Sequence, residues 1–268
     1  MAVVAFILAS TDAGPMIINR LDVCGCEAGY FGVGASLLQT GKFDQIDIDA
    51  LSYVLRLCRT HHGDGVVALD VGANIGTHTL AWAKLMRGWG QVIAIEAQER
   101  VYYALCGNIA INNLFNAEAI CAVAGETNGL MMIPVLDHEK PASFGSLELV
   151  PRTEEKIGQI PQRVQRAAML TIDDIMHNKR VDLIKFDIEG MEIGALEGAR
   201  ATIESFRPAL FIEWVKCGEQ PLRDFLGSYD YEIHILGANL LAIHRGDPIC
   251  EHVIIRTSDG REDSVAVT

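Results

Sequence analysis

From residue 65 onward, short apolar runs alternate with stretches in which apolar residues recur at the spacing of one helix face. Strands are expected at residues 66–71 (VVALDV), 91–97 (QVIAIEA), 117–124 (AEAICAVA), 181–188 (VDLIKFDI) and 208–214 (PALFIEW). Helices with one buried face are expected at residues 77–86, 100–112, 170–177 and 191–206. This alternation predicts a parallel sheet whose strands are joined by crossover helices.

Two further apolar runs, residues 231–236 (YEIHIL) and 240–245 (LLAIHR), are separated by the short turn Gly237-Ala238-Asn239. Glycine and asparagine are favoured in hairpin turns, so these two runs are expected to pair as antiparallel strands. The chain is therefore predicted to have an α/β, Rossmann-like fold, with a seven-stranded mixed sheet and helices on both of its faces.

An N-terminal extension, residues 1–60, lies outside this alternation. It contains strand-like pieces at Val3, Val4 and Ile7 and around MIINRLD, a glycine-rich turn (GYFGVGAS), and a helix expected over residues 44–59. That helix is expected to pack on the sheet or on a second subunit, so a homo-oligomer stays open.

Residues 136–166 form a second interruption, between the third and fourth parallel strands. They are polar and contain several prolines and glycines, and loops of this length are often lids or binding segments. The central domain is expected to span residues 61–250, with this insertion inside it, and residues 251–268 are interpreted as a C-terminal tail.

The composition of the chain argues against two classes of binding partner, nucleic acid and membrane. The 268 residues carry a net charge of −13, which argues against nucleic acid. The apolar start, MAVVAFILAS, is shorter than the roughly 20 apolar residues of a membrane span, so no membrane partner is expected. Seven cysteines without the spacing of a disulfide framework indicate a cytoplasmic protein.

The turn after the first parallel strand carries the first candidate chemistry. Asp70 ends that strand, and Gly72, Asn74 and Gly76 follow with the spacing D-x-G-x-N-x-G. Glycine lets a ligand approach bare backbone, and asparagine tolerates positive φ. A dinucleotide site would show G-x-G-x-x-G instead. The acidic residue suits a ligand with positive charge, such as S-adenosylmethionine with its sulfonium and ammonium groups.

The second and third parallel strands end in further candidates for the same ligand. Glu96 lies at the position of ribose-binding acids, where a carboxylate accepts both hydroxyls of an adenosine ribose; the alternative is an exposed loop acid. Ala122 and Val123 offer a small apolar surface to an adenine, although they could equally be strand core. The neighbouring Ala73, Thr77 and Ala97 are also expected to contact the cofactor.

Several motifs together resemble one known family. DVGANIGTHT, IEAQ, NIAINN, LTIDDI, VDLIKFDIEGMEIGALEGA and PALFIEW occur in the order and spacing of the FkbM-type S-adenosylmethionine-dependent methyltransferases, over residues 66–214. The chain departs from that family at Ala97-Gln98, where proline is common. The resemblance implies a Rossmann-like methyltransferase fold, the cofactor S-adenosylmethionine, and O-methylation of a small hydroxylated molecule such as a sugar or secondary metabolite.

The fourth strand carries the candidate catalytic residues. Its alternation directs Lys185 and Asp187 to one face, and Glu189 follows just past its end. The resemblance places this acid cluster, and Asp187 above all, beside the cofactor's transferred methyl group. The alternative is structural, with Asp187 capping the next helix and Lys185 as its ion-pair partner.

A divalent metal is a further alternative. Glu213 ends the fifth strand, and with Asp187 it could hold a metal that activates a substrate hydroxyl. Metal-dependent methyltransferases usually add an Asp-Asn pair here, whereas Trp214 follows Glu213 in this chain, so no metal is expected. Two other functions stay open, an NAD-linked oxidoreductase and a non-catalytic nucleoside-binding module.

Overall fold

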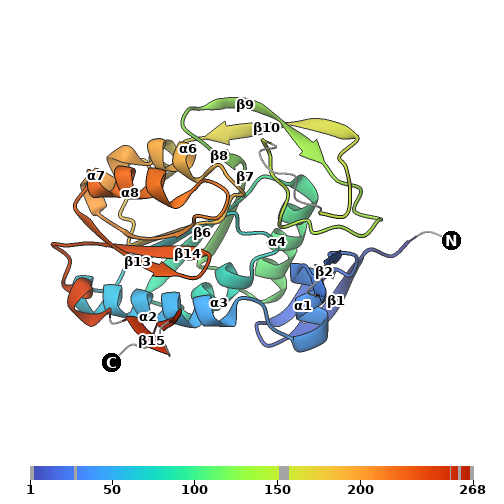
Figure 1. The fold of residues 1–268 in the computed structure, drawn as a ribbon. Helices are drawn as coiled ribbons and strands as arrows, with labels where there is room; N and C mark the ends of the chain where they lie inside the picture. The colour runs from blue at the N-terminus through green and yellow to red at the C-terminus, as the bar shows by residue number, and fades with distance from the viewer. Residues whose placement is uncertain (1–2, 27–28, 151–156, 254, 259–260, 266–268) are drawn as a thin grey trace.

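The computed structural model describes residues 3–26, 29–150, 157–253, 255–258 and 261–265 (Figure 1). Within this part of the chain the main sheet has seven strands in the order β13-β14-β12-β11-β5-β6-β7. Their bounds are β5 Val66–Val71, β6 Gly90–Glu96, β7 Ala117–Cys121, β11 Leu183–Phe186, β12 Ala209–Glu213, β13 Tyr231–Leu236 and β14 Asn239–His244. Strands β12, β11, β5, β6 and β7 are parallel, and β14 and β13 add an antiparallel pair at one edge. The predicted mixed α/β sheet is confirmed.

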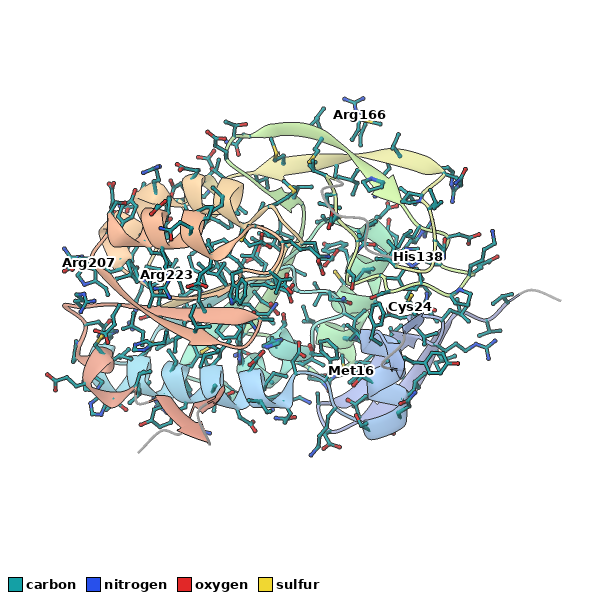
Figure 2. The ribbon with its side chains drawn as sticks, viewed as in Figure 1. Met16, Cys24, His138, Arg166, Arg207 and Arg223 are labelled. Carbon is teal, nitrogen blue, oxygen red and sulfur yellow. The ribbon has the colours of Figure 1, made fainter. Side chains whose placement is uncertain are left out.

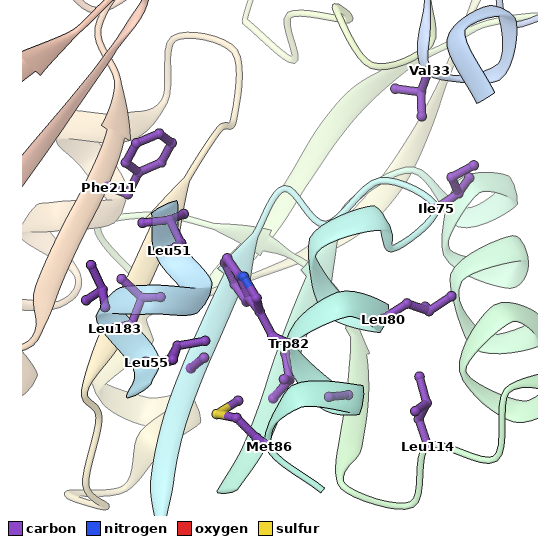
Figure 3. Packing of buried hydrophobic residues seen from close by; sticks show 14 of the residues in the cluster. Val33, Leu51, Leu55, Ile75, Leu80, Trp82, Met86, Leu114, Leu183 and Phe211 are labelled. Atoms are coloured by element: carbon purple, nitrogen blue, oxygen red, sulfur yellow. The ribbon is translucent and has the colours of Figure 1, made fainter. Parts of the chain in front are cut away.

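Helices cover both faces of this sheet (Figure 1). One face carries α2 (Gln45–His62), α3 (Thr77–Leu85) and α4 (Glu99–Ile111), and the other carries α5 (Ile172–Met176), α6 (Glu192–Glu197), α7 (Arg200–Phe206) and α8 (Glu219–Gly227). The reason is the alternation along each buried strand: in β5, Val66 and Ala68 join the first core and Val67 and Leu69 join the second. Trp82 of α3 is at the centre of the first core (Figure 3).

The N-terminal extension packs into the same first core, through Met16 and Ile18 and through Leu51 and Leu55 of α2. It forms β1 (Phe6–Thr11), β2 (Gly14–Asn19), β3 (Cys24–Cys26), β4 (Gly29–Phe31) and α1 (Val33–Thr40). Two expectations were wrong here. The opening strand begins at Phe6, leaving Val3 and Val4 exposed, and the expected glycine-rich turn is a strand followed by helix α1.

A small second sheet was not expected from the sequence. It has the order β8-β10-β9, with β8 at Val123–Ala124, β9 at Gly129–Val135 and β10 at Arg163–Leu170. The expected strand 117–124 is therefore divided, since β8 leaves the main sheet to pair with β10. The insertion 136–166 is not loop throughout, because β10 begins at Arg163; residues 151–156 of the insertion lie outside the described residues.

The expected helix 191–206 is also divided, into α6 and α7, with Gly198 and Ala199 between them. Gly198 lies so close to the Gly125 carbonyl that a side chain there would collide with it. The carboxylate of Asp173 then accepts the N–H groups of Ala201 and Thr202, at 3.0 and 2.7 Å, and so starts α7 afresh. Local hydrogen bonding overrides the continuous apolar periodicity.

The chain ends in the described region with η1 (Pro248–His252), β15 (Ile255–Ser258) and β16 (Arg261–Val265). Among the helices that the structure describes, none combines the length and the apolar character needed to cross a membrane.

Candidate functional site

A cavity of about 400 Å³ lies at the carboxyl ends of the parallel strands. Ligand pockets of open α/β sheets form at this edge, and the volume falls within the usual range for small-molecule sites. Its walls also include Phe31 and Gly32 of the extension, Ser143 and Leu147 of the insertion, and Asn239 of the β13–β14 turn. Segments far apart in the chain therefore close over one site.

The β5–α3 turn forms the floor of the cavity. Gly72 has φ +83°, and a side chain there would run into the carbonyl oxygen of Asp187. Asn74 has φ +50°, and its side-chain oxygen accepts the Ile75 N–H at 2.7 Å. Gly72 thereby lets the turn pass directly over the Asp187 carbonyl, and the backbone N–H groups from Gly72 to Gly76 are all hydrogen-bonded within the protein.

Glu96 stands next to this turn, at the end of β6. One of its carboxylate oxygens accepts the Asn74 N–H at 2.9 Å, and the other accepts the Gln98 N–H at 2.8 Å. Burial raises the pKa of Glu96 to about 7, against the opposing effect of these two hydrogen bonds. The carboxylate keeps further acceptor positions toward the cavity, which would suit a pair of hydroxyl donors.

The region of the cavity around Glu96, Ala97, Gln98, Ala122 and Val123 is called the Glu96 end below. Its roof comes from the insertion, because the Gln98 side chain donates to the Phe144 carbonyl at 2.8 Å. Ala122 and Val123 are both buried and apolar. One carboxylate beside a small apolar surface is the arrangement expected for a nucleoside.

The opposite region, over β11 and β12, is called the acidic end and is defined by five carboxylic acids of the lining. These are Asp44, Asp47, Asp187, Glu189 and Glu213. Strand order separates the two ends, since β5 lies between β11 and β6.

Lys185 is buried beneath the acidic end, only 4% exposed. Its Nζ donates to Asp187 Oδ2 at 3.1 Å and lies 3.7 Å from Asp70 Oδ1. Burial lowers the pKa of Lys185, but the charges of Asp187 and Asp70 outweigh that effect and raise it above its ordinary value. Lys185 is therefore a cation that holds Asp187 in place.

Glu189 and Glu213 face Asp187 across the cavity mouth. The three side chains offer carboxylate oxygens within 4.8 Å of one another, a spacing that a divalent ion could bridge. Burial, reinforced by the charge of Asp187, raises the pKa of Glu189 to about 8 and that of Glu213 to about 7. Glu189 also contacts the ammonium of Lys216, which lies 3.8 Å from Glu148.

Three lining residues were not predicted from the sequence: Asp44 and Asp47 of the acidic end, and His78. Asp44 precedes α2 and resembles a helix cap, yet it makes no side-chain capping bond and lines the cavity instead. Asp47 Oδ2 accepts from the Asn239 amide at 3.2 Å, which joins α2 to the β13–β14 hairpin. The sequence signal for Asp44 is weak: it is an acid that follows Phe43 directly before a helix, and both residues line the cavity.

His78 lies in the first turn of α3 and is 4% exposed. Its ring packs edge-on against Trp82, with centroids 5.3 Å apart, and it lines the cavity. Its Nε2 has no hydrogen-bond partner among the described residues. Burial, together with the charge of Lys185, lowers the pKa of His78 well below its ordinary value, so the ring is neutral at pH 7.

Most of the predicted site residues line this cavity. They are Gly72, Ala73, Asn74, Thr77, Glu96, Ala97, Ala122, Val123, Lys185, Asp187, Glu189 and Glu213. Asp70 and Gly76 do not. Asp70 is buried under the floor, where Thr79 Oγ1 donates to it at 2.6 Å, and Gly76 starts α3 with φ +93° against Leu105. These two residues therefore lie behind the cavity wall and do not contact the cavity.

His138, in the insertion, does not line the cavity either. It stacks on Phe144 with ring centroids 4.4 Å apart and lies beside Phe6, at the N-terminal side of the molecule (Figure 2).

Asp22 connects two walls of the cavity. It is 4% exposed, and its two carboxylate oxygens accept the Gly34 N–H at 2.9 Å and the Phe144 N–H at 3.0 Å. Gly34 belongs to the first turn of α1, which follows Phe31 and Gly32 of the lining, and Phe144 lies between Ser143 and Gly145, which line the cavity. One buried side chain thus sets the position of the extension relative to the insertion.

Comparison with known proteins identifies the family of this chain. The model of the methyltransferase FkbM domain matches residues 70–233, which is more than half of the chain. The chain belongs to the FkbM methyltransferase family. The match includes the β5–α3 turn, Glu96 and the Lys185 to Glu213 cluster, while the whole extension, residues 1–60, lies outside it. Comparison with curated proteins gave no match.

Several solved methyltransferase structures resemble part of this chain. The FkbM methyltransferase of Methylobacillus flagellatus KT has 22% identity and a TM-score of 0.46, covering 68% of this chain and 43% of its own. This chain thus spans less than half of that relative's length. Magnesium protoporphyrin IX methyltransferase (ChlM) of Synechocystis PCC 6803, solved with bound SAM, has 11% identity and a TM-score of 0.43, covering 75% and 79%.

Proposed function

We propose that this chain is an S-adenosylmethionine-dependent O-methyltransferase that methylates a hydroxyl of a small molecule, such as a sugar or a secondary metabolite. The observation that carries the proposal is Glu96, a buried carboxylate held by two backbone N–H groups beside the bare backbone of the β5–α3 turn. This arrangement fits the ribose of an adenosine and the amino-acid part of the cofactor next to it.

An NAD-linked oxidoreductase would share the strand order and the acid. The turn disfavours this function, because it does not match the dinucleotide motif G-x-G-x-x-G. Asn74 stands where the second glycine of that motif would be. The walls of the cavity also favour a single nucleoside, since Glu96 and the acidic end lie on opposite sides of β5. A second, pyrophosphate-linked nucleotide would have to place its charges among five carboxylic acids.

The residues divide the chemical work. When bound, S-adenosylmethionine supplies an activated methyl group, so the protein mainly orients the acceptor and removes its proton. Asp187 accepts the proton of the acceptor hydroxyl at its carboxylate, and Lys185 fixes the orientation of that carboxylate through the 3.1 Å hydrogen bond. Phe31, Gly32 and Leu147 cover the site and exclude water.

Calorimetric titration with S-adenosylhomocysteine and with NAD tests the proposal. We expect S-adenosylhomocysteine to bind and NAD to give no heat. NAD binding in preference to S-adenosylhomocysteine would refute it. Incubation of the protein and S-adenosylmethionine with hydroxylated metabolites, followed by detection of S-adenosylhomocysteine, separates an enzyme from a binding module that retains the pocket without turnover.

A further inference from the structure

The charge of the acidic end is not balanced within the cavity. Among the described residues that line it, Lys185 is the one lysine or arginine, and its ammonium is already engaged by Asp187 and Asp70. Lys216, outside the lining, contacts Glu189, which leaves Asp44, Asp47 and Glu213 without an ion pair to a lysine or arginine in the described chain. Five carboxylic acids are gathered at the same end. Carboxylates gathered this closely repel one another even when they are partly exposed, so this end of the cavity is organised for a group that brings positive charge.

His78 gives a second, independent indication of a ligand at this end. Its side chain is 4% exposed, it lines the cavity, and its Nε2 is without a hydrogen-bond partner in the described chain. A buried polar atom of this kind costs free energy unless a ligand completes its hydrogen bonding. A neutral imidazole accepts a hydrogen bond from an N–H or O–H donor.

The geometry points to an acceptor molecule that carries a positively charged amine, bound at the acidic end next to the hydroxyl that is methylated. This inference rests on the proposed function. The carboxylates of Asp47 and Glu213 would receive the ammonium group, and Asp187 stays available for the hydroxyl. Phe43 and Phe211 also line this end, and aromatic rings favour organic cations over neutral groups.

An ammonium group fits this end better than a divalent ion. Asp187 and Glu189 each contact a lysine ammonium already, so the carboxylates are arranged for N–H donors. A doubly charged ion between them would stand against the two positive charges of Lys185 and Lys216. Glu213 makes no ion pair among the described residues, and its Oε2 is closed off from solvent, which leaves its Oε1 for the acceptor's amine.

The probes for the test are benzylammonium and its neutral analogue benzyl alcohol, titrated into protein saturated with S-adenosylhomocysteine. We expect benzylammonium to bind with a Kd below about 50 mM, which is the range for a fragment of this size. Benzyl alcohol should bind about tenfold more weakly. Mg²⁺ is titrated separately and is expected not to compete with benzylammonium.

Variants locate the binding. Asp47→Asn and Glu213→Gln should each reduce the preference for benzylammonium about tenfold, because each removes a charged acceptor. Asp47→Asn retains an oxygen for the Asn239 amide, so the fold and the affinity for S-adenosylhomocysteine should be unchanged. Asp49→Asn is the matched control, since Asp49 lies on the same helix, is exposed and does not line the cavity.

The inference is overturned if benzylammonium does not bind, if benzyl alcohol binds equally well, if Mg²⁺ displaces benzylammonium, or if Asp49→Asn has the same effect as Asp47→Asn. Failure of the proposed function gives a different result, because then S-adenosylhomocysteine itself does not bind while the preference between the two probes can still be measured on the protein alone.

Discussion

Asp22 and Phe144 are joined by a hydrogen bond across 122 positions of the chain, from the Phe144 N–H to Asp22 Oδ1 at 3.0 Å. The second oxygen of Asp22 holds Gly34 at 2.9 Å. The cover of the cavity therefore depends on a residue that does not face the ligand.

Asp22→Asn tests this dependence. The amide has one acceptor oxygen and an NH₂ group, which would face a backbone N–H, so one of the two walls should lose its anchor. We expect affinity for S-adenosylhomocysteine to fall about tenfold, as measured by calorimetry. Asp182→Asn is the control, because Asp182 is also buried and accepts the Val67 N–H at 2.9 Å but does not line the cavity. It should lower the melting temperature and leave the affinity unchanged; equal effects on affinity would contradict the prediction.

Glu96 should make nucleoside binding depend on pH. Its pKa is raised to about 7 by burial, and hydroxyl donors bind the ionised form. Below pH 7 the carboxyl takes up a proton that binding must remove, so the affinity for adenosine should fall about tenfold from pH 8 to pH 6. Adenosine is a suitable probe because it has no charge for the acidic end. Glu96→Gln should bind weakly at both pH values, and a variant with the wild-type pH profile would rule out this role.

Asp187→Asn should separate binding from turnover. The substitution keeps the shape of the side chain but removes its capacity to take the acceptor proton, so the rate should fall by ~10²–10⁴-fold. Affinity for S-adenosylhomocysteine should stay close to that of the wild type. Rates are compared with an acceptor that the wild-type protein methylates. A wild-type rate in the variant would make Asp187 a structural partner of Lys185 alone.

Gly72→Ala should destabilise the protein beyond the cost of its backbone conformation. A methyl group at Gly72 would meet the Asp187 carbonyl, so strands β5 and β11 would have to separate locally. Gly63→Ala is the matched control, because Gly63 has a similar φ of +77° with nothing within 4 Å of an added Cβ. The control should cost about 1 kcal/mol in urea unfolding and Gly72→Ala about 2 kcal/mol more. Equal losses would show that the turn can relax.

Much of the site was predictable because strand order places certain residues at one edge of a sheet. Glu96 ends β6 and Asp187 follows β11, the two strands on either side of β5, and both line the cavity. Asp70 ends a strand too, but alternation turns its side chain under the floor, toward Thr79. The rule for strand ends therefore located the edge correctly but not the direction of every side chain.

The missed residues belong to segments whose position depends on distant contacts. Asp47 looks like an ordinary acid in the first turn of a helix, and only the docking of α2 beside the β13–β14 turn brings it to the cavity. His78 follows the glycine turn with no distinguishing pattern, and its orientation is set by packing on Trp82. Strands β9 and β10 were missed because their pairing joins residues on both sides of a long polar insertion.

The walls of the cavity come from segments far apart in the chain, Gly32 from the extension and Asn239 from the β13–β14 turn. Closing loops of such length is entropically costly, so contacts of this kind form after the local ones during folding. The binding site is consequently a late product of folding, complete only when both terminal regions have docked on the central sheet. A ligand that binds only the completed site raises the free energy of unfolding. The size of that increase therefore measures whether both terminal regions are docked on the sheet.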